Sequence, residues 1–298
     1  RTGFRANPAW WGEKEHNIST IVFQPSASAA TRVAALLSGE IDMMFPAPLQ
    51  DVDRINNADG FKVLEGPEER SMFIGFDHFR DELIDSNVKG KNPFKDLKVR
   101  KAVYHAIDVG TIRDRIMRGK AEPTNLLLAP TTQGFVPELN ERGPYDPEMS
   151  KALLAEAGYP DGFTTGMDCP NDRYVNDEAI CQAVVSMLAR VGIKVDLLAQ
   201  TRSQYFSKIL KYETSMYLLG WAASGTKDAH NTLSQLAASI DSGLGGSYNA
   251  GRYSNPELDE LTKQIGVRSA RSFSSRRSSS SRTTMHSCRC ISSTLRGR

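Results

Sequence analysis

Motifs that would mark an enzyme, and apolar runs that would mark a membrane span, are missing from this sequence of 298 residues. No apolar stretch approaches the roughly 20 residues that a membrane-spanning helix needs. The nucleophile motif G-x-S-x-G, the zinc motif H-E-x-x-H and the P-loop are absent, and the GLGG run at Gly243–Gly246 is too weak for a phosphate loop. We therefore expect no enzyme activity and assign no catalytic residue.

Cysteine is scarce as well. The chain has four cysteines, and two of them, Cys288 and Cys290, lie in an unusual C-terminal segment. Cys169 and Cys181 are the only two before that segment, and no group of residues has the spacing of a metal site. We therefore expect neither a metal nor a cofactor.

The composition is that of an ordinary globular protein, with 40% hydrophobic and 24% charged residues. The length predicts roughly two domains, each able to bury a core. The sequence opens at Arg1 with no starting methionine and no signal peptide, so we expect a fragment of a longer protein. The absence of a signal peptide from this sequence is therefore no evidence about the cellular compartment.

The N-terminal part reads as alternating strands and a helix. A β-rich run at Ile18–Phe23, a helical run at Thr31–Ser38 and an apolar run at Glu40–Phe45 predict a strand–helix–strand unit. Two further strands are predicted at Phe61–Glu65 and Met72–Phe76.

The clearest helical pattern lies in the stretch Lys91–Gly119. Asp96 can cap a helix, apolar residues follow at helical spacing, Asp108 starts a second helix, and Gly119 would end it. Later helices are predicted near residues 146–158, 177–192, 203–212 and 255–265, and strands near 193–197 and 216–221. This alternation predicts an α/β fold with a mostly parallel or mixed sheet.

Four phrases resemble one protein family. They are RANPAWWG from Arg5, ALLSGEIDMM from Ala35, the NPF.D..VR.A..AID...I...I..G pattern from Asn92, and YDPEMSKALLAEAGYPDGF from Tyr145. Together they resemble the family 5 extracellular solute-binding proteins, the peptide-binding subunits of ABC importers. The resemblance implies a two-lobe fold like that of the type II periplasmic binding proteins. Residues 1–77 would be a partial lobe one and residues 78–265 a nearly complete lobe two.

The resemblance also implies a function. We expect capture of a peptide or another small solute in the cleft between the lobes, followed by delivery to the permease subunits of an ABC importer. The protein would be a monomer, periplasmic or membrane-anchored outside the cell, and would not bind nucleic acid. The alternatives are a hydrolase of the same fold, or nucleic-acid binding through the C-terminal tail.

That tail, residues 266–298, has eight Arg, eleven Ser and no Lys, Asp, Glu or Pro. The eight arginines of the tail outweigh the net charge of +2, so the rest of the chain is acidic. It has neither helical nor strand periodicity, and we expect disorder. Codons for Thr283–Arg296 can be chosen so that reading two nucleotides later gives DDALLPLHQQHLAW, which resembles a late strand of the family. We interpret the tail as a frameshift rather than an RNA-binding segment.

Arg173 and Tyr174 are the first candidates for ligand binding, in the phrase DCPNDRYVND between a predicted strand and a predicted helix. A guanidinium group can bind a carboxylate through two parallel hydrogen bonds. The resemblance implies that Arg173 meets the C-terminal carboxylate of a peptide. The other interpretation is an ion pair of Arg173 with Asp172 or Asp177.

Trp221 ends a predicted strand and would stack on a ligand, or else fill the core of the lobe. Many peptide-binding relatives have an Asp three residues later, for the ligand's amino group, where this chain has Ser224. Asp228 would replace that acid, or the ligand would lack a free amine. The resemblance also places Tyr248 and Asn249 near the cleft.

Overall fold

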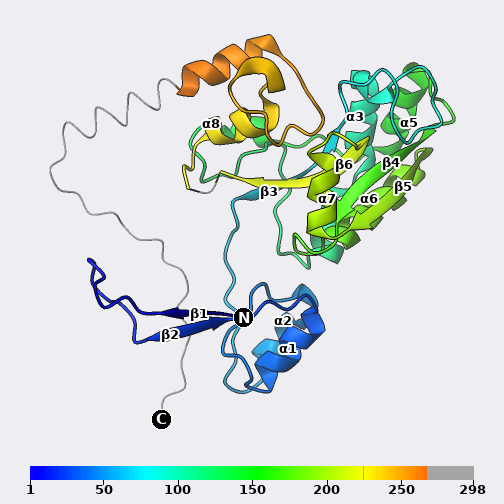
Figure 1. Cartoon of the computed structure of the whole chain (residues 1–298). Coiled ribbons are helices and arrows are strands. Elements are labelled where there is room, and N and C mark those ends of the chain that lie inside the picture. The colour runs from blue at the N-terminus through cyan, green and yellow to red at the C-terminus, as the bar shows by residue number, and fades with distance from the viewer. Residues whose placement is uncertain (224, 267–298) are drawn as a thin grey trace. The chain divides into compact units, whose positions relative to one another are not determined.

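Figure 1 traces the chain as a computed structural model, which describes residues 1–223 and 225–266. The chain forms two compact units, one of residues 1–65 and one that begins at Gly66. Strand β3 (Arg70–Phe76) therefore belongs to the second unit. The lobe boundary expected after residue 77 stays a prediction about the intact protein.

The first unit contains a β-ribbon and two helices. Strand β1 (Thr2–Arg5) pairs antiparallel with β2 (Thr20–Phe23). Helix α1 (Ala29–Leu37) begins at Ser28, whose hydroxyl accepts a hydrogen bond from the Thr31 N–H group, and a 3-10 turn, η1 (Leu49–Asp51), leads into α2 (Val52–Asn56). A small core joins the two helices through Val33, Leu36 and Ile55.

The predicted strand–helix–strand unit is wrong. Within the described residues, neither residues 40–45 nor residues 61–65 form a strand, and β2 takes β1 as its partner instead. A strand exists only through hydrogen bonds to a neighbour, and the described part of this unit offers the two apolar runs none. Met43 and Phe45 are accordingly 60% and 82% exposed.

The second unit is built on a four-stranded mixed sheet with the order β3-β6-β4-β5. Strands β4 (Phe163–Pro170) and β5 (Ile193–Gln200) run parallel, β6 (Met216–Ala222) is parallel to β4, and β3 is antiparallel to β6. Seven of the eight residues of β4 are buried, as a strand covered on both faces requires. The α/β class and the mixed sheet are confirmed.

The predicted caps of the second unit are confirmed. Asp96 accepts a hydrogen bond from the Lys98 N–H group at the start of α3 (Leu97–Ala106), and Asp146 does the same for Met149 at α5 (Pro147–Glu156). Asp108 caps α4 (Val109–Thr111), which continues as the π-helical turn η3 (Ile112–Ile116).

The remaining helices lie in the later part of the unit. They are α6 (Asp177–Ala189), α7 (Arg202–Ile209), α8 (Ala229–Thr232), the π-helical turn η5 (Leu233–Ala237) and the 3-10 turns η2 (Pro93–Lys95), η4 (Pro137–Asn140) and η6 (Ile240–Ser242). Residues 256–266 are also helical. No helix in the described ranges is long and apolar enough to cross a membrane.

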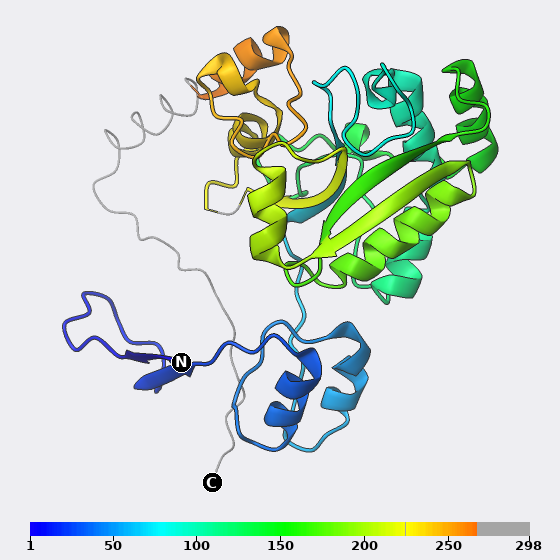
Figure 2. The ribbon, with the colours of Figure 1, turned by 45° about the vertical axis from the view of Figure 1, so that its right-hand side comes forward.

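The two faces of the sheet are covered by different helices. Along β6, Met216 and Leu218 pack into a core with α3, α5 and α6, whereas Tyr217 and Leu219 pack into a second core with α7. Successive side chains of a strand point to opposite faces, so α7 and α6 lie on opposite sides. Figure 2 shows α6 running along β4 and β5. The helices on both faces reach the edge of the sheet at which β4, β5 and β6 end.

Candidate functional site

A hollow of about 430 Å³ lies at the edge where the three parallel strands end. Its walls come from the start of β3, the β4–α6 loop, α7, the end of β6 and a later loop. They comprise Arg70, Arg173, Tyr174, Arg202, Phe206, Leu210, Leu219, Gly220, Trp221, Ala222 and Tyr248. The crevice beyond the carboxyl ends of parallel strands is where open α/β sheets generally bind ligands. All of these residues belong to the second unit.

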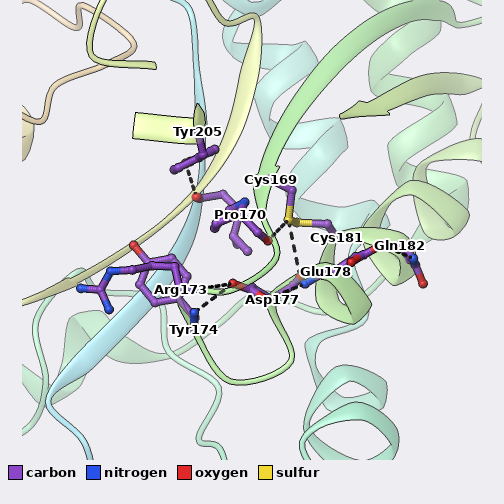
Figure 3. The surroundings of a disulfide bond; sticks show 10 residues. Cys169, Pro170, Arg173, Tyr174, Asp177, Glu178, Cys181, Gln182 and Tyr205 are labelled. Carbon is purple, nitrogen blue, oxygen red and sulfur yellow. Dashed lines mark hydrogen bonds between the residues drawn. A yellow bond between two sulfur atoms is a disulfide. The ribbon is translucent and has the colours of Figure 1, made fainter. Parts of the chain in front are cut away.

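Asp177 holds the loop that carries Arg173 and Tyr174. One of its carboxylate oxygens accepts hydrogen bonds from the backbone N–H groups of both residues at 2.9 Å, and the other accepts from Glu178 at 3.0 Å. Figure 3 shows the carboxylate inside the curve of this loop, bonded to both residues. Burial raises the pKa of Asp177 in spite of these bonds. Asn176 completes the turn with a φ of 55° and donates to the Ile116 carbonyl at 2.9 Å.

A disulfide bond links the two elements that flank this loop. Cys169, near the end of β4, is bonded to Cys181 in α6, and both residues are fully buried (Figure 3). The two isolated cysteines that flank the candidate loop are a visible signal for this bond, but the pairing is not predicted from the sequence. With Asp177 it fixes the path of the chain between β4 and α6.

Tyr174 joins this loop to β6. Its hydroxyl accepts a hydrogen bond from the Gly220 N–H group at 3.1 Å and donates to the Gly220 carbonyl at 3.3 Å. Burial raises the pKa of Tyr174, so the phenol stays protonated and able to donate. A Cβ atom at Gly220 would lie 2.4 Å from the Met72 Sδ atom and 3.0 Å from the Tyr174 ring, so a larger residue there would displace these side chains.

The side chain of Arg173 is directed toward the hollow. Its guanidinium carbon lies 4.9 Å from the centre of the Tyr174 ring, and in Figure 3 the side chain extends away from the disulfide. No ion pair with Asp172 or Asp177 occurs among the described residues: Asp172 accepts from the Arg202 N–H group, and Asp177 accepts from backbone groups. The described residues therefore do not show the ion pair of Arg173 that the second interpretation expects.

Two further arginines of the hollow were missed by sequence reasoning. Arg70 forms a 2.7 Å ion pair with Glu68, donates to the Gly220 carbonyl at 3.3 Å, and lies 5.6 Å from the Tyr174 ring centre. Arg202 is the first residue of α7. Neither stands in a distinctive local phrase, and only the sheet topology brings them beside Arg173.

Aromatic rings form the opposite wall. The Trp221 ring centre lies 4.9 Å from that of Tyr248, and Phe206 meets Tyr248 edge-on at 6.4 Å. The Trp221 indole N–H group donates to the Asn231 side chain at 3.2 Å. Trp221 is partly exposed and packs only at the margin of the core, so it presents a ring surface to the hollow.

Comparison with known proteins identifies the family. The sequence profile of the bacterial extracellular solute-binding proteins, family 5 (middle), matches residues 1–243. The chain belongs to this family. Its members are binding proteins, and the fold is that of the type II periplasmic binding proteins, as the resemblance implied.

Individual relatives differ in the solute that their names record. Heme-binding protein A of Haemophilus influenzae is 28% identical over 254 residues, 84% of this chain and 44% of the relative. Glutathione-binding protein GsiB of Escherichia coli K12 is 28% identical over 263 residues, 86% of this chain and 48% of the relative. The chain thus spans about half the length of these curated relatives.

Solved structures of the family have the same fold. The dipeptide-binding protein of Pseudoalteromonas sp. SM9913, in complex with Met-Leu, has a TM-score of 0.73 and 26% identity, and it is matched over 88% of this chain and 49% of its own. DppA from Helicobacter pylori, in complex with the peptide STSA, has a TM-score of 0.74 at 24% identity, covering 88% and 48%.

Of the predicted ligand-binding residues, Arg173, Tyr174, Trp221 and Tyr248 come together in the hollow. Asn249 is buried behind it, with its amide N–H₂ group donating to the carbonyls of Ala238 and Tyr253. Their ligand-binding roles stay predictions.

The remaining candidates are Asp228 and Ser224. Asp228 is absent from the lining of the hollow and caps α8 by accepting from the His230 N–H group at 2.7 Å. Ser224 and residues 267–298, with the frameshift and disorder expected there, lie outside the described residues. Within the described part, no cluster of His, Cys, Asp and Glu could hold a metal ion.

Proposed function

We propose that the intact protein captures a small solute with a carboxylate group, a peptide in the first instance, and that the hollow of the second unit is part of its binding site. The observation that carries the proposal is the pairing of three guanidinium groups with an aromatic wall at the carboxyl edge of the sheet. Membership of a family of solute-binding proteins supports it.

The chemistry of the walls suits a ligand that is acidic at one end and apolar beside it. A guanidinium group binds a carboxylate through two parallel charge-assisted hydrogen bonds. Such bonds contribute about 1.5–3 kcal/mol each in proteins. Arg173 is suited to this role because Asp177 and the disulfide fix its backbone. Trp221 and Tyr248 would pack against the apolar part of the ligand.

Membership of the family supports a proposal for the partners and the location. The protein would deliver its solute to the permease subunits of an ABC importer, as a monomer in the periplasm or anchored to the outer face of the membrane. In the intact protein a second lobe would close over the ligand, and the ligand would shift the population from open to closed.

A hydrolase of the same fold is the less favoured alternative. None of the residues lining the hollow is Ser, Cys, His, Asp or Glu, so the hollow lacks the usual nucleophiles and general bases of hydrolases. The sequence motifs of hydrolases are missing as well. Nucleic-acid binding was proposed only for the tail, and family membership gives it no support.

Isothermal titration calorimetry with a panel of dipeptides tests the proposal, with Met-Leu as the first probe. Arg173→Gln should lower the affinity at least tenfold, because it removes about 1.5–3 kcal/mol of charge-assisted bonding. Arg190→Gln is the matched control, since it removes the same charge from an exposed site at the far end of α6. Equal losses in both variants, or peptide cleavage without stoichiometric binding, would contradict the proposal.

A further inference from the structure

The hollow contains more positive charge than one carboxylate requires. Three arginines line it, and no acidic residue does. The carboxylates around it are already engaged. Asp172 accepts a hydrogen bond from the Arg202 backbone N–H group, and Asp177 accepts from those of Arg173 and Tyr174. Glu68 pairs with Arg70, Glu69 pairs with Lys227 at 3.2 Å and with the Thr131 hydroxyl, and Asp168 in β4 pairs with Lys208 at 2.8 Å. The lining therefore has excess positive charge and favours an anion.

The three arginines are not equivalent. Arg70 is bonded to Glu68 and to the Gly220 carbonyl, which leaves it little capacity for a ligand. The guanidinium groups of Arg173 and Arg202, in contrast, pair with no carboxylate in the described ranges. Asp172 accepts a hydrogen bond from the backbone N–H group of Arg202, not from its guanidinium group.

The backbone holds these two arginines just beyond the ends of adjacent strands. They follow β4 and β5, which are neighbouring parallel strands, and the Asn171 N–H group donates to the Gln200 carbonyl at 2.9 Å across the gap. The position of α7 is fixed in turn by the Tyr205 hydroxyl, which donates to the Leu218 carbonyl, and by the Lys208–Asp168 ion pair. Both cationic side chains thus extend from rigid supports into one hollow.

We propose that Arg202 is a specificity-determining residue that selects solutes with a second acidic group. Such a solute has one carboxylate on Arg173, another on Arg202, and an apolar part against Phe206, Trp221 and Tyr248. Peptides with an acidic side chain next to the C-terminal carboxylate are the simplest members of this class. The inference rests on the proposed function and adds a preference within it.

The dipeptides Leu-Glu and Leu-Gln test this preference, because they are nearly isosteric and differ by one negative charge. The full chain should bind Leu-Glu three- to tenfold more tightly in calorimetry at low salt, since Arg202 is exposed and its pairing is partly screened. Arg202→Gln should abolish the preference, so that Leu-Glu and Leu-Gln bind with equal affinity. Arg173→Gln should weaken both dipeptides, and Arg190→Gln should change neither.

The outcomes separate this inference from the proposed function. Equal affinity of the two dipeptides for the parent chain, or a preference that survives in Arg202→Gln, would overturn the selection while leaving solute binding intact. Binding of neither dipeptide would count against both proposals. If Arg190→Gln loses the preference for Leu-Glu as fully as Arg202→Gln does, the preference comes from the net charge of the protein and not from Arg202.

Discussion

Replacing Asp177 with alanine removes the carboxylate that accepts the backbone hydrogen bonds of the Arg173 loop. The carboxylate accepts three backbone hydrogen bonds, from Arg173, Tyr174 and Glu178, at 2.9 to 3.0 Å. Asp177 is 3% exposed, so water has little access to the backbone N–H groups that would lose their acceptor. The substitution should weaken both the fold and the binding of a ligand.

The size of the effect follows from these bonds. A buried donor left without an acceptor costs about 1–3 kcal/mol, but part of the loop is accessible to water, which can replace some of the lost bonding. The raised pKa indicates that burial of the charge outweighs its hydrogen bonds, so alanine also relieves some desolvation. We therefore expect a net loss of about 2–3 kcal/mol for Asp177→Ala. Asp177→Asn keeps an acceptor oxygen and should lose less than half as much.

Urea unfolding followed by circular dichroism measures the change in the free energy of unfolding, and calorimetry with Met-Leu measures the change in affinity. Glu178→Ala is the matched control, because it removes the same charge one residue away but only a 3.2 Å bond to the Gln182 side chain. The reasoning is refuted if Asp177→Ala and Glu178→Ala unfold at the same urea concentration.

Three further changes are predicted in the second unit. Removing the disulfide with Cys169→Ala and Cys181→Ala should cost about 3 kcal/mol of unfolding free energy, from the entropy of a loop with 12 residues of separation, and unchanged urea midpoints would contradict this. Gly75→Ala should cost about 1–3 kcal/mol, because its Cβ atom would lie 2.2 Å from the Tyr217 ring, whereas Gly66→Ala, with open space around it, should be neutral. Burial, aided by the charge of Arg100, lowers the pKa of His78 from 6.5 to about 4. The unfolded state then binds more protons between these values, so stability is full above pH 6.5 and falls as the pH drops toward 4. The ring is partly exposed, which reduces the loss from a limit of about 3 kcal/mol to about 1–2 kcal/mol. His78→Gln should flatten this part of the pH profile, and an unchanged slope would rule out His78 as its source.

The helices of the second unit could be predicted because their signals are local. Asp96, Asp108 and Asp146 each cap the helix that their position in the sequence indicated. The capping side chain bonds backbone groups two or three residues away, so a short window of sequence contains the whole interaction. The same holds for the apolar faces that follow each cap.

Strand pairing and the full membership of the hollow could not be predicted, because both depend on distant residues. The apolar run at Glu40–Phe45 has a suitable composition but lacks a hydrogen-bonded neighbour in the described part of its unit. Arg70 joins the hollow only because β3 pairs with β6, with Ser71 opposite Trp221. Trp221 itself was found because an aromatic residue at a strand end is visible in the sequence.

A crystal structure of the chain with its tightest-binding dipeptide tests the central claim most directly. The account predicts electron density for the ligand in the hollow, with its terminal carboxylate within hydrogen-bonding distance of the Arg173 guanidinium group and its apolar side chain against Trp221. Ligand density at another place on the chain, with Arg173 and Trp221 untouched, would contradict the account.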